Sequence, residues 1–212
     1  MSESPMMLSA RFDVALSFAS RLHAAQLRKG TPIPYVAHLL AVSSLVLEHG
    51  GSEDEAIAAL LHDAIEDQGG AATREIIRRL FGEQVVSIVD GCTDAETIPK
   101  PPWRERKEAY VAHIRHAPAS VRLVSMADKL HNARSILADL RVLGDQLWTR
   151  FSGGRAGTLW YYRALVEAYS ANGSHPLVEE LDRVVSEIER LAAAARSSSA
   201  LTVESSKRTA EA

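Results

Sequence analysis

The spacing of the apolar residues constrains the fold more than any other feature of this sequence. Phe12, Leu16, Ala19 and Leu22 lie three or four residues apart and would form one stripe on a helix, and similar spacing recurs along most of the chain. Segments that alternate apolar and polar residues between turn formers, as half-buried strands do, are nearly absent. The sequence therefore predicts an all-α fold, a bundle of roughly eight to ten helices.

Glycine and proline residues divide the chain into the expected helices. We expect helices over residues 9–29, 35–48, 52–66, 75–80, 84–92, 103–116, 119–140, 158–171 and 177–195. The third of these is apolar almost all round between residues 56 and 61, so we expect it to be central and buried. One domain should cover residues 1–195. Residues 196–212 are rich in serine and threonine, and we expect them to form a disordered tail.

Composition limits the kind of partner. The 212 residues are 46% hydrophobic and 24% charged, with a formal net charge of -3, so neither nucleic acid nor a membrane is indicated as a partner. The single cysteine, Cys92, excludes an internal disulfide framework and fits a cytoplasmic setting. No signal peptide is visible, and the apolar run over residues 36–47 is too short to cross a bilayer. We expect a small-molecule ligand; the sequence indicates no oligomeric state.

Residues 60–67, Leu-Leu-His-Asp-Ala-Ile-Glu-Asp, carry the strongest chemical signal. Helical spacing places His62 near Glu66 and Asp63 near Asp67, so four ionisable groups gather at the end of an apolar helix. Burying these groups together is costly unless a ligand such as a divalent cation binds them. The alternative is an ordinary helix C-terminus whose acidic end is solvated.

Two further polar residues lie in apolar runs. His38 and Asp128 are each surrounded by aliphatic residues; read alone, they fit a hydrogen-bonded core histidine and a capped or solvated aspartate. Together with His62 and Asp63 they form a set of two imidazoles and two carboxylates, which leaves coordination positions open for water and substrate. Such mixed nitrogen and oxygen ligands suit Mn²⁺ and are compatible with Fe²⁺, Co²⁺ or Zn²⁺.

The order of these motifs resembles that of the HD phosphohydrolase superfamily and, more closely, the hydrolase domain of RelA/SpoT-type alarmone enzymes. The resemblance covers roughly residues 10–170 and rests on residues 23–30, 34–38, 60–67, 81–82, 89–93 and 127–134. Residues 97–100 and 160–162 are similar to those of the small stand-alone hydrolases. The chain departs from the family pattern at Leu39, where proline is usual, and at Ala25, where glycine is usual.

The resemblance implies an HD-domain bundle that hydrolyses the 3′-pyrophosphate of ppGpp or pppGpp to GDP or GTP plus pyrophosphate, with Mn²⁺ as cofactor. It implies that His38, His62, Asp63 and Asp128 hold the metal. It also makes Glu66 and Asp67 catalytic: Glu66 would position the attacking water, and the part of Asp67 in proton transfer is less defined. The alternative for Glu66 is a hydrogen-bonded partner of a metal histidine.

The resemblance further implies substrate contacts. Arg28 and Lys29 would contact guanine, although cations at a helix C-terminus more often complement the helix dipole. Asn132 would contact the ribose, and Lys129 would bind phosphate or pair with nearby carboxylates. Lys100 would contact the distal 5′-phosphates. Its neighbours Arg104, Arg106 and Lys107 share that expectation, the alternative being a solvated helix start.

Aromatic and histidine side chains complete the expected site. Tyr161 would face the ribose or phosphates, while at least two of residues 160–162 should pack in the core. His23 and Gln26 share a helix face and would support the site. We expect the remaining histidines to be structural or on the surface; they are His49, His113, His116, His131 and His175.

Two rival functions stay open at this stage. The same site could serve an HD phosphohydrolase for another nucleotide, such as NADPH or a dNTP. A non-catalytic nucleotide-binding module is the other alternative, which the intact set of candidate ligands and acidic residues disfavours. Turnover assays with ppGpp, NADPH and dNTPs distinguish these two functions from alarmone hydrolysis.

Overall fold

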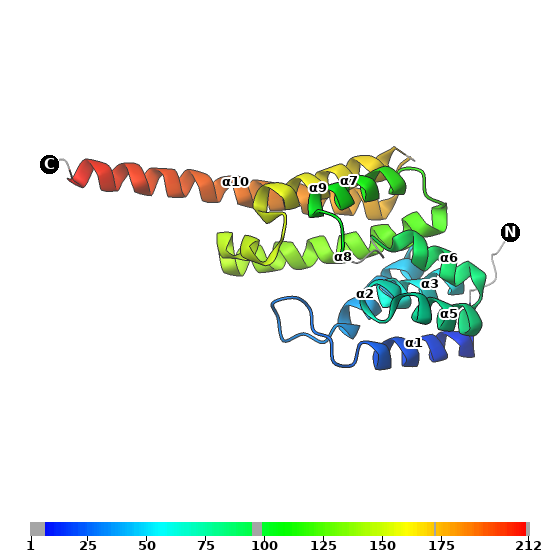
Figure 1. Cartoon of the computed structure of the whole chain (residues 1–212). Helices are drawn as coiled ribbons and strands as arrows, with labels where there is room; N and C mark the ends of the chain where they lie inside the picture. Colours follow the sequence, from blue (N-terminus) through cyan, green and yellow to red (C-terminus); the bar gives the residue numbers. More distant parts are fainter. Residues whose placement is uncertain (1–6, 95–98, 172, 211–212) are drawn as a thin grey trace.

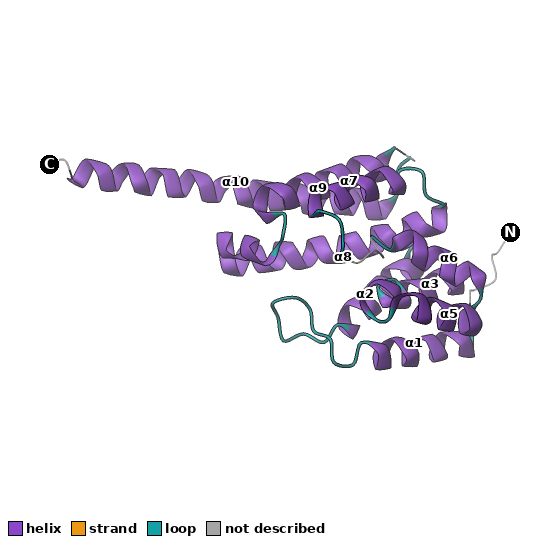
Figure 2. Ribbon diagram, viewed as in Figure 1, coloured by secondary structure: helices purple, strands orange, loops and turns teal. Residues whose placement is uncertain are grey.

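The computed structural model describes residues 7–94, 99–171 and 173–210, with side chains described as far as residue 194. The helices are α1 (Ala10–Leu22), α2 (Val36–Glu48), α3 (Glu53–Leu61), α4 (Ala64–Asp67), α5 (Gly70–Phe81), α6 (Glu83–Cys92), α7 (Trp103–Ile114), α8 (Ala119–Leu143), the 3-10 helix η1 (Gly144–Arg150), α9 (Gly154–Ser170) and α10 (Pro176–Ala210). Within the described ranges no strand forms, and one isolated antiparallel bridge joins Leu27 to Pro34. The prediction of an all-α bundle is confirmed (Figure 2).

Helix α3 lies at the centre of one half of the molecule, among α1, α2, α6 and α8 (Figure 1). Every residue from Ala56 to Leu61 is fully buried, as its all-round apolar sequence predicts. The helix begins with a capping box, in which Ser52 and Glu55 satisfy each other's backbone N–H groups. The fully buried segment 56–61 thus leads directly to His62, which caps the C-terminal end of α3.

Helix α8 joins the two halves, because it packs against α2, α3 and α6 on one side and α9 and α10 on the other. Helix α10 packs along α8 and α9 and then extends beyond the bundle (Figure 1). It continues to Ala210, through most of the residues expected to form a tail. The disorder of that tail and the limits of the domain stay predictions.

Several helix boundaries differ from those expected from the sequence. Helix α1 ends at Leu22 rather than at residue 29, because the chain folds back after His23 into a loop closed by hydrogen bonds from Tyr35 N to Gln26 O and from Arg28 N to Ile33 O. Helix α3 ends at Leu61, and residues 62–63 form a turn before α4. Helix α5 begins at Gly70 rather than at residue 75, α9 begins at Gly154 rather than at residue 158, and η1 was not expected. The early ends of α1 and α3 place Arg28 and Lys29 in a loop, and His62 and Asp63 in a turn, rather than on regular helix.

Among the described residues, no helix combines the length and the apolar character needed to cross a bilayer.

Candidate active site

Three separate segments bring the four predicted metal ligands together. His38 comes from α2, His62 and Asp63 from the turn after α3, and Asp128 from α8. Nε2 of His38 lies 3.2 Å from Asp128 Oδ1 and 3.8 Å from Asp63 Oδ2. Nε2 of His62 lies 2.9 Å from Asp63 Oδ2 and 3.6 Å from Asp128 Oδ1. We call these four residues the His-Asp cluster.

The hydrogen bonds of the two histidines leave one nitrogen of each free for a ligand. Nδ1 of His62 donates to the carbonyl of Ala59 at 2.8 Å, so Nε2 of the neutral ring carries the lone pair. Nδ1 of His38 lies 2.8 Å from Nδ1 of His131. Both Nε2 atoms are buried without a hydrogen-bond partner, although carboxylate oxygens lie close by. Ligand atoms of His38, His62 and Asp128 all lie within 4.8 Å of one another, so this donor set fits a divalent cation.

The electrostatics of the cluster favour a bound cation. Burial alone would raise the pKa values of Asp63 and Asp128, but the charges of His62 and Lys129 hold both below their usual range. Burial lowers the pKa of His38. Burial also acts to lower the pKa of His62, yet the two carboxylates raise it well above its ordinary value. The carboxylates thus attract positive charge to the space between the rings, and a metal ion competes with a proton for it.

The two predicted catalytic carboxylates lie in different environments. Glu66 accepts a hydrogen bond from Lys100 Nζ at 2.6 Å and another from the backbone N–H of Asp94 at 3.3 Å. Asp67 accepts from Gln26 Nε2 at 2.8 Å, and its pKa is raised by burial and by the nearby charges of Asp63 and Glu66. Glu66 is therefore fixed in position by two donors, whereas the raised pKa of Asp67 makes it the better proton carrier.

Gln26 links Asp67 to the first motif. Its Oε1 lies 2.6 Å from His23 Nδ1 and accepts a hydrogen bond from Gln68 Nε2 at 2.8 Å. His23 is itself buried and stacks on Tyr35, with ring centroids 5.3 Å apart. The structure thus places His23 and Gln26 where a supporting role was expected.

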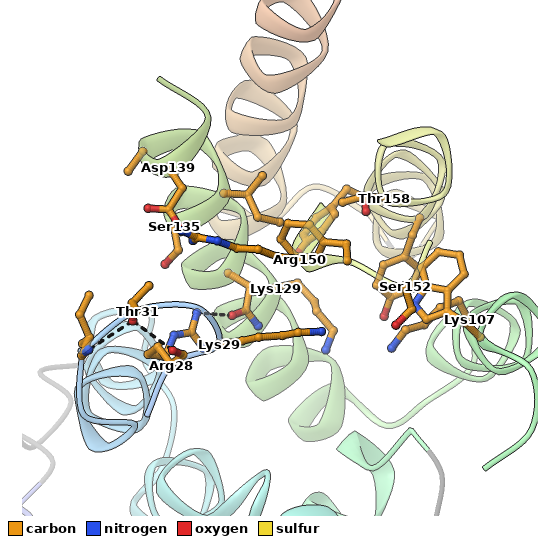
Figure 3. A pocket seen from close by; sticks show the side chains of 18 of the residues that line it. Arg28, Lys29, Thr31, Lys107, Lys129, Ser135, Asp139, Arg150, Ser152 and Thr158 are labelled. Carbon is orange, nitrogen blue, oxygen red and sulfur yellow. Dashed lines mark hydrogen bonds and ion pairs between the residues drawn. The ribbon is translucent and has the colours of Figure 1, made fainter. Parts of the chain in front are cut away.

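A cavity of about 510 Å³ lies beside the cluster (Figure 3). Its lining includes the cations Arg28, Lys29, Lys107, Lys129 and Arg150. It also includes Thr31, Ile33, Tyr35, Trp103, Asn132, Ser135, Ile136, Ala138, Asp139, Phe151, Ser152, Thr158, Tyr161 and Tyr162. The cavity and the cluster share partners, because Lys129 and Asn132 each donate to Asp128 at 2.5 Å and the Tyr35 hydroxyl donates to Asp63 at 2.5 Å. A polyanion in this cavity would have its charge next to the cluster.

The structure brings most of the predicted substrate residues to this cavity. Arg28, Lys29, Lys129, Asn132 and Tyr161 line it. Lys100 instead pairs with Glu66, outside the lining. Arg28 and Lys29 belong to the loop after α1 rather than to a helix C-terminus, so complementing the helix dipole does not explain them.

Of the three basic residues in α7, one reaches the cavity. Lys107 contacts Asp94 at 2.8 Å and lies 4.9 Å from the Tyr161 ring centre. Arg106 pairs with Asp94, and Arg104 stacks over Trp160 at 3.2 Å.

The aromatic residues of α9 divide between core and surface. Tyr161 and Tyr162 are buried and Trp160 is half-buried, as expected for core packing of at least two of the three. Of the similar segment 97–100, Thr97 and Ile98 lie outside the described residues.

Sequence reasoning missed two residues of the site. His131 was expected to be structural or on the surface, yet it contacts His38; its position three residues after Asp128 on one helix was an available signal. Arg150 lines the cavity from η1, a segment with no apolar periodicity or motif to indicate its position.

Fold and site together define a helical protein with a buried histidine–aspartate centre beside a cationic cavity. Residues 15–159 match the HD domain family, and the chain belongs to that family. It is 40% identical over 125 residues to the guanosine-3′,5′-bis(diphosphate) 3′-pyrophosphohydrolase MESH1 of Xenopus tropicalis, covering 58% of this chain and 67% of that protein. The Homo sapiens protein of the same name is 38% identical over 127 residues, with the same shares covered.

Solved structures resemble the fold over most of its length. The structure described as a metazoan ortholog of SpoT that hydrolyses ppGpp aligns with a TM-score of 0.69 at 28% identity, covering 86% of this chain and 96% of that one. A Listeria monocytogenes EGD-e structure aligns with a TM-score of 0.65 at 28% identity, covering 74% and 99% respectively.

Proposed function

We propose that this protein hydrolyses the 3′-pyrophosphate of guanosine tetra- or pentaphosphate, giving GDP or GTP and pyrophosphate, with a divalent cation at the His-Asp cluster. The observation that carries the proposal is the cationic cavity joined to the cluster through Lys129, Asn132 and Asp128. The named activity of relatives such as the Xenopus tropicalis protein supports the same substrate. The single cysteine fits activity in the cytoplasm.

His38, His62, Asp63 and Asp128 would hold the cation. Their free Nε2 atoms and ionised carboxylates supply the donors. We favour Mn²⁺, because the set mixes imidazole nitrogen with carboxylate oxygen and lacks thiolate. When bound, such a cation lowers the pKa of water toward neutrality and offsets phosphate charge.

The cations of the cavity would bind the nucleotide in order along its length. Lys129 and Asn132, held beside the cluster, would contact the 3′-pyrophosphate and ribose. Lys107, on the side of the cavity opposite Ser135 in Figure 3, would contact the 5′-phosphates. Lys100 would join it if its ion pair with Glu66 opened and Lys100 bound phosphate instead. Arg28 donates to Asn132 at 2.7 Å and lies 5.8 Å from the Tyr35 ring centre, so its guanidinium is held at the cavity, where a base would stack on it.

The two catalytic carboxylates would act at opposite sides of the reacting phosphorus. Glu66, fixed by Lys100 and the Asp94 backbone, would position water for attack on the phosphorus attached to the ribose 3′-oxygen. The phosphorus–oxygen bond to the ribose then breaks, and the 3′-oxygen takes up a proton. Asp67, whose pKa is raised, is placed to supply that proton.

Assays of pyrophosphate release test the proposal. Purified protein is incubated with Mn²⁺, Mg²⁺, Co²⁺, Fe²⁺ or Zn²⁺ and with ppGpp, pppGpp, NADPH, GTP or dNTPs. We expect rapid release of pyrophosphate from ppGpp with Mn²⁺. His62→Ala should abolish this release and the bound metal, measured by elemental analysis. Robust turnover of NADPH or a dNTP without release from ppGpp would refute the alarmone assignment, and unchanged metal content in His62→Ala would refute the metal site.

A further inference from the structure

One carboxylate lies among the cavity-lining residues, and it is out of place in a cavity for a polyanion. Five cations line the cavity, and Asp139 is the exception. A carboxylate repels phosphate, so Asp139 must lie where the uncharged part of the ligand binds. We propose, resting on the proposed function, that Asp139 and Arg150 form a base-recognition pair that binds the Watson–Crick edge of guanine.

The pair is held in place by the fold. Arg150 Nη1 donates to Asp139 Oδ2 at 2.8 Å. Arg150 lies against Gly30, whose φ of +72° favours glycine, and a Cβ added there would come within 2.8 Å of the Arg150 Nε atom. The side chains of Arg150 and Asp139 are 25% and 37% exposed, so a ligand in the cavity can reach both.

The position of the pair along α8 fits the length of a nucleoside. Asp128, Asn132, Ser135 and Asp139 follow one another at spacings of four, three and four residues, and therefore form one stripe that spans about 16 Å of helix. The cluster lies at one end of this stripe and Asp139 at the other. Figure 3 places Asp139 and Ser135 on the opposite side of the cavity from Lys107 and Ser152. A nucleotide whose 3′-phosphates lie at the cluster and whose 5′-phosphates approach Lys107 would direct its base toward Asp139.

The chemistry of the pair matches guanine rather than adenine. Guanine presents two donors, N1–H and the 2-amino group, next to the acceptor O6. The two oxygens of Asp139 would accept from these donors, and Arg150, already bonded to Oδ2, would donate to O6 in the same plane. Adenine presents an acceptor at N1 and would leave the carboxylate unpaired. Xanthine has an oxygen in place of the 2-amino group and would be repelled by Asp139.

Exchange of Asp139 for asparagine tests the proposal, because its amide can donate to the 2-oxygen of xanthine. We would measure kcat/KM with Mn²⁺ for the 3′,5′-bis(diphosphates) of guanosine, xanthosine and adenosine. The wild type should prefer guanosine. Asp139→Asn should lower kcat/KM for guanosine by about 10- to 100-fold and raise it for xanthosine, so that the preference reverses. Asp182→Asn, which breaks another partly exposed aspartate–arginine pair, between α10 and Arg163 of α9, should leave the preference unchanged.

Three results would overturn the base-recognition pair. An equal loss for all three bases in Asp139→Asn would mean that Asp139 only holds Arg150. Unchanged kcat/KM values in Asp139→Asn would exclude Asp139 from base recognition, and a wild type indifferent to the base would exclude the pair. Each leaves the proposed function intact. If the wild type released pyrophosphate from none of the three substrates, the proposed function itself would be refuted. Unfolding temperatures within the range of the wild type would establish that the variants fold.

Discussion

Replacing His131 with phenylalanine should weaken Mn²⁺ binding at the His-Asp cluster, although His131 is not one of the proposed ligands. Its Nδ1 atom lies 2.8 Å from Nδ1 of His38, whose ring is buried. Burial, His38 and Arg28 lower the pKa of His131 to about 4, so at neutral pH it is uncharged and can accept the His38 proton. That hydrogen bond fixes the tautomer of His38 that offers Nε2 to a metal.

The magnitude follows from the burial of His38. The rings of His38 and His131 lie 4.8 Å apart between centroids. Phenylalanine at position 131 would keep this ring contact but leave the buried Nδ1–H of His38 without an acceptor. An unsatisfied buried donor costs about 1–3 kcal/mol, which corresponds to a roughly 5- to 150-fold change in an equilibrium constant. Loss of a hydrogen-bond partner of a metal histidine typically weakens metal binding by about 10- to 100-fold. We therefore expect the Kd for Mn²⁺ to rise by about 10- to 100-fold.

Calorimetric titration of metal-stripped protein with Mn²⁺ measures this Kd directly. His131→Gln, whose amide oxygen can accept the same proton, should recover part of the affinity. His116→Phe, at an exposed position, should bind like the wild type. A Kd within twofold of the wild-type value in His131→Phe would show that His131 does not orient His38, and the reasoning would be wrong.

Three further predictions test the reaction, the core and the pH dependence of stability. Glu66→Gln should retain Mn²⁺ but lose about 10²- to 10⁴-fold in kcat, whereas exposed Glu108→Gln should not; undiminished kcat would remove Glu66 from the mechanism. Leu60→Ala, at a fully buried position of α3, should lower the free energy of unfolding by about 2–5 kcal/mol in urea titrations, against less than about 0.5 kcal/mol for Val142→Ala at an exposed site. Because the pKa of His131 is about 4 in the folded protein, against an ordinary value of 6.5 that the unfolded chain keeps, the unfolded chain binds its proton first as the pH falls. Metal-stripped protein should therefore lose about 1–2 kcal/mol of stability between pH 6.5 and 4, less than the full shift because the ring is partly exposed. A pH profile unchanged in His131→Phe would contradict that assignment.

The chemistry of the cluster could be predicted from the sequence because it depends on residue type and local spacing. Apolar runs that end in, or are interrupted by, His38, His62 and Asp128 can only be buried if those side chains find partners. The central position of α3 likewise follows from its composition. These inferences need no knowledge of which helices are neighbours.

The surroundings of the cluster could not be predicted in the same way. Lys100, expected to contact substrate, pairs with Glu66, while Lys107 reaches the cavity from the next helix. Which lysine reaches the cavity depends on the path of the loops, where turn geometry and not periodicity sets the direction of a side chain.

The sequence by itself determined an all-helical fold, a buried α3 and the set of residues able to hold a cation. Only the tertiary structure decided that α1 ends early so that Arg28 lies in a loop facing α8, that His131 supports His38, and that Arg150 crosses Gly30 to reach Asp139. Helical periodicity is a local property of about four consecutive residues, whereas each of these contacts joins residues 11 or more positions apart. Packing of the whole bundle, and no local preference, brings such residues together.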